Sequence, residues 1–212
     1  QIFGAVEAYI DGDGANGIQA DRLSLSADDL STIKAIAVAA ALAISVAPTP
    51  SGVGVSVAIA ATIANNEIGN FVNASIRNAS KVSASAGNVS LAGIAIAAQQ
   101  AADIDSVAVS AAIAAAVAPI GISFSGAGTN ATNTITSVIN ASIEDSVSVT
   151  SGGAIDITAD SDSAISSRIA AAALSASLVA AAGGVTISKN TISDTVTAKV
   201  TDTTLKANVG DI

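Results

Sequence analysis

An asparagine followed by a fixed spacing of aliphatic residues occurs three times in this chain. The pattern is Asn-x-Ile-x-x-x-(Val/Ile)-x-Ala-x-(Ile/Val), and its copies begin at Asn66, Asn133 and Asn190. The copies are 67 and 57 residues apart, too far for local similarity and too close for independent domains of ordinary size. A shortened copy opens the chain and consists of Ile2, Val6, Ala8 and Ile10. We therefore predict a repeat array.

The array has four sections, and the first and last are incomplete. The sections are residues 1–65, 66–132, 133–189 and 190–212. The first is truncated at its start and the last only begins, so we expect the chain to be a stretch of a longer array.

Long runs in these sections alternate large and small side chains. In residues 36–46 the large residues stand at even positions, with alanine or serine between them, and the alternation resumes in residues 53–63 after a Pro- and Gly-containing break. A period of two with β-branched residues on one face predicts β-strands. Leu174 and Leu178 are four residues apart, however, and alanine is the best helix former. A helical hairpin therefore remains the alternative for the Ala-rich runs.

Two short strands separated by a turn follow each asparagine-led segment. The sequence predicts them at 81–85 and 89–92, and again at 146–150 and 154–158. Together with the long runs they predict an all-β fold, a β-solenoid or related rod of stacked strands with long Ala-rich strands. The alternative fold is a mixed α+β repeat in which the Ala-rich runs are helical hairpins.

The alternation changes parity at each repeated asparagine. The large residues stand at odd positions up to Ile63 and at even positions from Ile68. In a straight strand this change would move the large apolar side chains to the opposite face, and a bend in the chain would avoid that. We therefore predict a bend just before Asn66, Asn133 and Asn190. Asparagine suits a corner because it tolerates left-handed backbone angles. In a stacked structure the three side chains would also form a ladder.

Short side chains occupy the other face of the long runs. A sheet that presents alanine and serine can be approached closely by another sheet. We therefore expect this face to pack against a neighbouring sheet, either within the rod or in another subunit. The predicted packing residues are Ala37, Ala39, Ala41, Ala43, Ala108, Ala112, Ala114 and Ala116.

Three segments resemble a family of very large repetitive bacterial surface and secreted adhesins, of the filamentous-haemagglutinin or leukotoxin-like type. They are NEIGNFVNASIRNASKVSASAGNVSLA (66–92), NTITSVINASIEDSVSVTSGGAIDITA (133–159) and NTISDTVTAKVTDTTLKA (190–207). The resemblance implies a parallel β-solenoid exported by a Gram-negative bacterium, located outside the cell or on its surface, with a role in adhesion or surface structure. It carries no catalytic residues with it.

We accordingly expect a non-catalytic structural segment that acts as an adhesin stalk or fibre. The alternative is a subunit of a self-assembling extracellular filament. A flat-faced binder, for example of ice, is a weaker alternative that would need a regular threonine array around Thr132, Thr134 and Thr136. The expected partners are neighbouring repeats, identical subunits, or a host, cell or matrix surface.

Composition argues against several other functions. The chain has no His and no Cys, which removes Ser-His and Cys-His nucleophile systems and ordinary zinc sites. Its aromatic content of 2% disfavours deep ligand pockets, so we expect no enzyme. A net charge of −9 disfavours nucleic acid as a partner. We expect no transmembrane span, because the charge-free runs break after about a dozen residues and a spanning helix needs roughly 20.

Acidic residues give the only metal candidate. Asp11, Asp13 and Asp21 alternate with glycines in an 11-residue stretch that resembles a calcium loop. The EF-hand spacing fails, because a Gly is missing at the turn and no Glu closes the loop. An acidic solvent turn is the default interpretation, with Ca²⁺ as the alternative. The paired carboxylates at 103 and 105 and at 160 and 162 are expected to be solvated strand ends.

Overall fold

The chain is all-β in the computed structural model, which describes residues 1–85 and 93–212. The Ala-rich runs are strands, so the helical-hairpin alternative is wrong. Only an extended backbone puts alternate side chains of these runs on one face. The strands are β1 (Ile2–Asp11), β2 (Ile18–Ala20), β3 (Leu23–Asp29), β4 (Thr32–Val46), β5 (Val53–Arg77), β6 (Val82–Ala84), β7 (Ile94–Gln100), β8 (Asp103–Val117), β9 (Ile120–Ile135), β10 (Val138–Glu144), β11 (Ser148–Ser151), β12 (Ile155–Ser161), β13 (Ala164–Ala176), β14 (Val179–Ile192), β15 (Thr195–Thr201) and β16 (Thr204–Ala207).

The chain coils through successive layers, and each of these strands pairs in parallel with its counterpart in the next layer. The strand orders are β14-β9-β5-β10-β15 with β1 beside β5, then β16-β11-β6-β2, β12-β7-β3 and β13-β8-β4. Asn66 is the register partner of Asn133, and Asn133 is that of Asn190. In the opening segment, Ile2 pairs with Ile68. Residues at equivalent places in the asparagine-led pattern are therefore neighbours along the stack.

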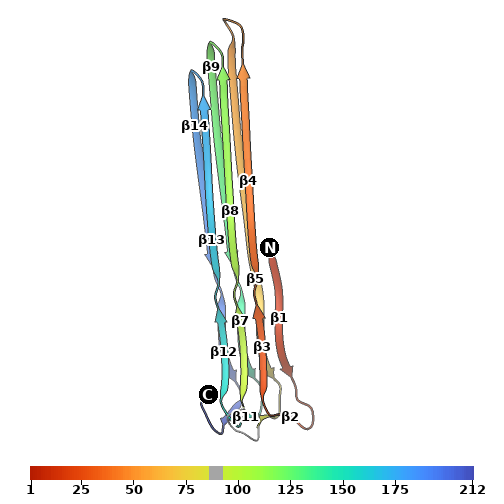
Figure 1. Cartoon of the computed structure of the whole chain (residues 1–212). Coiled ribbons are helices and arrows are strands. Elements are labelled where there is room, and N and C mark those ends of the chain that lie inside the picture. Colours follow the sequence, from red (N-terminus) through yellow and green to blue (C-terminus); the bar gives the residue numbers. More distant parts are fainter. Residues whose placement is uncertain (86–92) are drawn as a thin grey trace.

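Each layer has two parts, which we call the base and the blade (Figure 1). The base is a three-sided coil of β1, β2 and β3 with their counterparts in the later layers. The blade is a long two-sheet extension in which β4, β8 and β13 face the N-terminal part of β5 together with β9 and β14. The chain reverses at the tip of the blade, as at Ala47–Gly52 between β4 and β5.

Large aliphatic side chains fill the base. Val72, Ile76, Ile139, Ile143 and Val149 are completely buried there and pack in one cluster. Burying one such side chain stabilises the fold by roughly 1.5–3 kcal/mol. The base therefore contains an ordinary hydrophobic core.

Small side chains fill the blade instead. Ala58, Ala60, Ala112, Ala114 and Ala127 form its central cluster. Cα atoms of facing strands approach within 8 Å, closer than the roughly 10 Å between ordinary stacked sheets. The expected packing alanines all face this interior: those at 108, 112, 114 and 116 are buried, and those at 37, 39, 41 and 43 pack against the buried clusters from the outermost layer.

The bend predicted just before the repeated asparagines is wrong. Strand β5 runs straight through Asn66, and the inward positions stay even from Gly54 to Ile76. In the next two layers the strand ends only after the asparagine, at Ile135 and Ile192. The parity of the large residues changes because these residues point outward in the blade and inward in the base.

The left-handed corner lies elsewhere, where the chain leaves β1, β5, β10 and β15. Gly12 (φ 78°), Asn78 (φ 54°), Asp145 (φ 49°) and Asp202 (φ 47°) occupy it. Glycine, asparagine and aspartate are the residues that adopt this conformation at least cost. Asparagine does occupy a left-handed corner in this chain, at Asn78 rather than at Asn66, Asn133 or Asn190.

The short predicted strands correspond to β6, β11 and β12, and the strand predicted at 89–92 lies outside the described residues. β11 and β12 do not pair with each other. β11 pairs with β6 and β16, and β12 pairs with β7. Sequence neighbours therefore contribute to different sheets of the base.

Residues 1–85 and 93–212 include no helix with the length and apolar character needed to cross a bilayer.

Candidate functional site

The repeated asparagines form a ladder between the sheets at the root of the blade. Asn66 Nδ2 donates to Asn133 Oδ1 at 2.8 Å, and Asn133 Nδ2 donates to Asn190 Oδ1 at 2.8 Å. Asn66 Nδ2 also lies 3.3 Å from Ser106 Oγ in the facing sheet. Asn133 has no exposed surface. The central amide, Asn133, thus accepts from one neighbouring layer and donates to the other, which favours this register of the stack.

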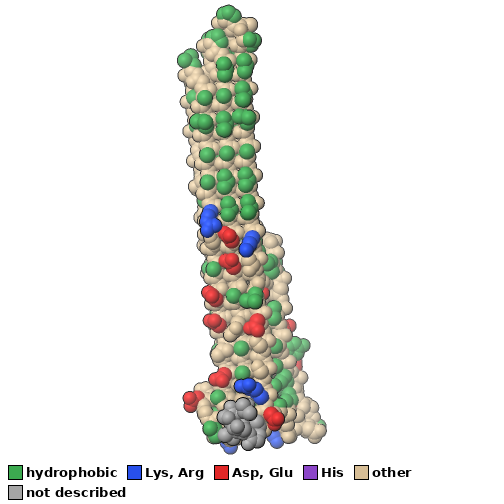
Figure 2. Space-filling model, viewed as in Figure 1, with side chains coloured by type: hydrophobic (Ala, Val, Ile, Leu, Met, Phe, Trp, Pro, Cys, Tyr) green, Lys and Arg blue, Asp and Glu red, His purple; other side chains and the backbone are tan. Residues whose placement is uncertain are grey.

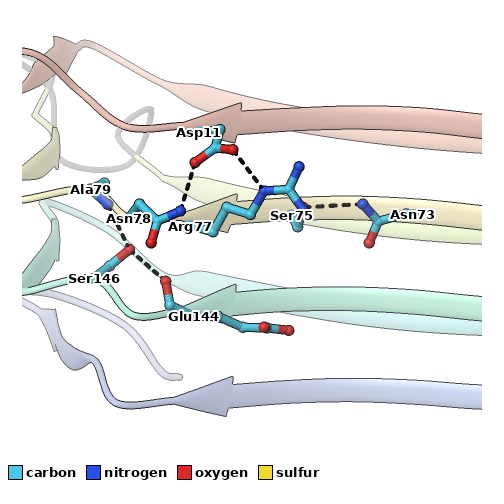
Figure 3. Close-up of polar contacts among 8 residues, drawn as sticks. All are labelled: Asp11, Asn73, Ser75, Arg77, Asn78, Ala79, Glu144 and Ser146. Carbon is cyan, nitrogen blue, oxygen red and sulfur yellow. Dashed lines mark hydrogen bonds and ion pairs between the residues drawn. The ribbon is translucent and has the colours of Figure 1, made fainter.

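A second asparagine ladder lies in the base. Asn140 Nδ2 donates to Asn73 Oδ1 at 2.8 Å. Asn73 Nδ2 donates in turn to Ser75 Oγ at 3.1 Å, a contact that Figure 3 shows. Asn140 repeats the contact with Ser142 at 3.2 Å. Both ladders join consecutive layers through side chains in addition to the backbone.

Two of the three predicted calcium residues, Asp11 and Asp13, bind protein groups, and Asp21 lies apart from them beside Ser83 and Ser85. Asp11 accepts hydrogen bonds from Arg77 Nε (3.2 Å) and Asn78 Nδ2 (2.7 Å) (Figure 3). Asp13 accepts from the Lys81 backbone N–H and from Ser80 Oγ, and these bonds lower the pKa of its carboxyl. No three acidic residues converge on a metal-sized site in the described part of the chain. The carboxylates of Asp11 and Asp13 therefore serve as connections between layers.

The acidic pairs lie near the junction of base and blade. Asp160 and Asp162 line a groove of about 430 Å³ together with Asp28 and Asp29. Asp105 lies 3.7 Å from Arg168 Nη1, too long for a hydrogen bond, so the contact is an attraction between charges. The four aspartates of the groove give it an acidic lining.

A buried polar network closes the junction behind this groove. Asn70 Nδ2 donates to Asp29 Oδ2 (2.7 Å) and to Ser31 Oγ (2.8 Å). In the next layer Gln100 Nε2 donates to Ser137 Oγ (2.8 Å). Ser137 N donates to Asp194 Oδ1 (2.9 Å). The residues of the network differ from layer to layer, but the network stays at the same level. It therefore separates the aliphatic core of the base from the alanine-filled interior of the blade.

The Glu144–Lys199 ion pair gives a pH prediction. Lys199 Nζ lies 2.9 Å from Glu144 Oε1, and this contact, with a hydrogen bond from Ser142, lowers the pKa of Glu144. A lowered pKa stabilises the fold above the pKa of the unfolded chain, and the gain is lost as the pH falls through the folded value. Glu144→Gln should cost less than about 1 kcal/mol at pH 7, because the pair is partly exposed, and nothing at acid pH.

A double-mutant cycle with Lys199→Met, measured by urea unfolding at pH 7 and pH 3, isolates this pair. An equal coupling energy at both pH values would contradict the assignment.

The outward faces of the blade are the feature that sequence reasoning missed. Valine, isoleucine and leucine cover both faces, and Ile36, Leu42 and Ile59 are 78%, 68% and 74% exposed. The sequence contained the signal, since the parity change at Asn66 in a straight strand means that the large residues leave the interior. We misread it because large aliphatic residues are normally buried.

The threonine series does not form the array that an ice-binding face needs. Thr132 has Asn65 and Lys189 as register partners, and Thr134 has Glu67 and Thr191. A mixed row of this kind presents no regular threonine lattice.

No protein-family model, no curated protein and no solved structure matches the chain.

Proposed function

We propose that the chain is a non-catalytic structural segment of a large extracellular bacterial surface protein, in which a β-solenoid acts as an adhesin stalk or fibre. The observation that carries the proposal is the register of the stack. Equivalent residues of successive layers are direct partners along both the blade and the base. Such a structure extends by adding layers, and each layer is stabilised mainly by its neighbours.

The end layers support this role. Ile139 and Ile143 are completely buried, whereas their partners in the last layer, Val196 and Val200, are 45% and 41% exposed. A further layer placed on β15 would cover these side chains. The resemblance of the asparagine-led segments to large bacterial adhesins supports the extracellular assignment, and the absence of His and Cys supports a role without nucleophilic catalysis.

A fusion of two copies tests the rod. Two backbone hydrogen bonds show where Ile212 lies in its layer. Ile94 N donates to Ala154 O, the residue before Ile155, and Ile155 N donates in the same way to Asp211 O, the residue before Ile212. Ile212 therefore occupies the same place in its layer as Ile155, Ile94 and Leu23. A second copy that begins at Ser24 directly after Ile212 therefore continues the stack in phase. We expect this fusion to melt at a higher temperature than the single chain and to form a particle nearly twice as thick along the stacking direction in electron micrographs, with the length of the blade unchanged.

The matched control is a fusion whose second copy begins at Ser51, at the tip of the blade and half a layer out of phase. It should melt like the single chain and show two separate bodies. Identical melting of the two fusions would count against coupling between layers, and with it against the rod.

A self-assembling filament is the second candidate. β4 and β13 lie at opposite edges of their sheet and pair on one side only, and unpaired edges are templates for another chain. Electron microscopy of the unfused chain separates the two proposals, since a filament subunit forms long fibres alone and a stalk segment does not.

A further inference from the structure

The blade beyond its root has apolar surfaces on both sides. We define the distal blade as residues 36–64, 107–131 and 169–188. Its exposed large side chains are Ile36, Val38, Leu42, Ile44, Val46, Val53, Val55, Val57, Ile59, Ile63, Ile113, Val117, Ile120, Phe124, Leu174, Leu178, Val179, Val185 and Ile187. Ile113 and Phe124 belong to the middle layer and remain 44% and 46% exposed. Stacking more layers would therefore not bury these faces.

Apart from Asn130, which faces outward near the root, the polar side chains on the strands of the distal blade point the other way. Ser56 Oγ donates to Ala43 O (2.7 Å), Thr62 Oγ1 donates to Val109 O (2.9 Å), and Ser110 and Thr129 share a hydrogen bond of 2.8 Å between the sheets. Among the described residues, the buried side-chain atoms without a partner belong to Asn70, Gln100 and Asp105, outside the distal blade. Hydroxyls are satisfied inside and aliphatic groups face outward, the reverse of a water-exposed sandwich.

Charge is absent from the distal blade and begins at its root. None of its residues is Asp, Glu, Lys or Arg. Arg168 stands in register with Val107 and Ile36 on one face, and Lys189 with Thr132 and Asn65 on the other. Figure 2 shows the apolar rows above a band of basic and acidic side chains at this level. Long basic side chains at such a boundary can extend toward water while their stems stay in an apolar phase.

The depth of this uncharged part fits a lipid bilayer. Eleven residues from 36 to 46 extend about 36 Å at about 3.3 Å per residue, against a hydrocarbon thickness of about 30 Å. A helix needs roughly 20 residues to cross this layer, whereas a strand covers it with about 9–11.

We propose that the distal blade inserts into the hydrocarbon layer of a lipid bilayer, with Lys34, Arg168 and Lys189 at the headgroup level. Hydrocarbon chains cover both faces and the uncharged tip at once. A second copy packed face to face would cover one side and leave the other in water. The internal hydrogen bonds of the blade remain in place, as a nonpolar solvent requires.

The strand edges of the outermost layers set one condition on this insertion. β4 and β13 expose backbone groups on one side, and hydrocarbon does not tolerate such groups unpaired. Pairing them requires a further layer from another copy, a step that rests on the proposed stacking. Insertion is therefore expected to be cooperative in protein concentration, while the fusion experiment above tests the stacking without lipid.

Flotation with phosphatidylcholine vesicles tests insertion. We expect the chain to float with the vesicles and Leu42→Glu to lower the bound fraction about tenfold. Thr32→Glu adds the same charge on the same face of β4 but below Lys34, so it should bind like the original chain. Circular dichroism without lipid checks that both variants keep their strands. A chain that stays at the bottom of the gradient over the whole concentration range would overturn the proposal.

The cysteine-free sequence permits a depth measurement. Single variants Leu42→Cys and Thr32→Cys carry an environment-sensitive fluorophore, and the vesicles contain lipids brominated on the acyl chains. We expect strong quenching at 42 and little at 32. Equal quenching at both positions would contradict insertion by the blade. A different result would also overturn insertion. If the chain forms oligomers without lipid that do not float, and the label at 42 is shielded from water in them, the apolar faces pack against a second copy.

Discussion

Ala112→Leu is expected to lower the free energy of unfolding by about 2–3 kcal/mol, the upper range for forcing extra methylenes into a packed interior. Ala112 is buried between the sheets of the blade among Ala58, Ala60 and Ala127. The sheets approach so closely that they leave no room for an isobutyl group. To accept it, they must separate along several residues, because the paired strands move together.

The control is Ala111→Leu, one residue away on the outward face of β8. The added side chain stands beside Ala40 and Ala172 in register and meets no facing sheet, so the expected change is within about 0.5 kcal/mol. Urea unfolding followed by circular dichroism measures both. Comparable losses for the two variants would mean that the alanine face is not a tight interface.

Asn133→Ala is expected to destabilise the chain by about 2–4 kcal/mol. The substitution removes two buried amide hydrogen bonds, each worth about 1 kcal/mol. It also leaves the Asn190 carbonyl without its donor and Asn66 with only its longer contact to Ser106. A buried group left unpaired costs about 1–3 kcal/mol. The loss lies between layers, so the unfolding transition should also become less cooperative.

Asn130→Ala in the same strand provides the comparison. Asn130 points outward beside Ile63 and Ile187 and lies outside the ladder, so its replacement should change stability by less than about 0.5 kcal/mol. If the two asparagine variants unfold at the same urea concentration, the ladder contributes nothing beyond the backbone pairing.

The positions of the strands and their stacking partners were predictable because both depend on local pattern. In residues 36–46 the large side chains stand at every second position or nearly so. Only an extended chain places such residues on one face. Equivalence of the asparagine-led segments predicted which residues become neighbours, and Asn66, Asn133 and Asn190 are neighbours in the structure. In a stack of parallel layers, identical residues at identical places pair without further information.

The corner shows where local reasoning failed, and the acidic stretch at 11–21 shows what a local motif leaves out. Asn66 and Asn78 are the same residue type, but only Asn78 has a positive φ, because the base turns there and the blade continues straight past Asn66. Asp11 and Asp13 resembled metal ligands in sequence, whereas the next layer places Arg77, Asn78 and Ser80 against them. Donors that arrive from 66 or 67 residues away are not visible in a local motif.

The sequence by itself determined that this chain forms strands, that its asparagine-led segments lie beside one another, and that large and small side chains alternate along the long strands. Only the tertiary structure decided which face is inside. Alternation divides a strand into two sides but assigns neither to the interior. In the base the large side chains enclose a core, while in the blade alanine, serine and threonine fill most of the space between the sheets, and most valines and isoleucines are left on the surface.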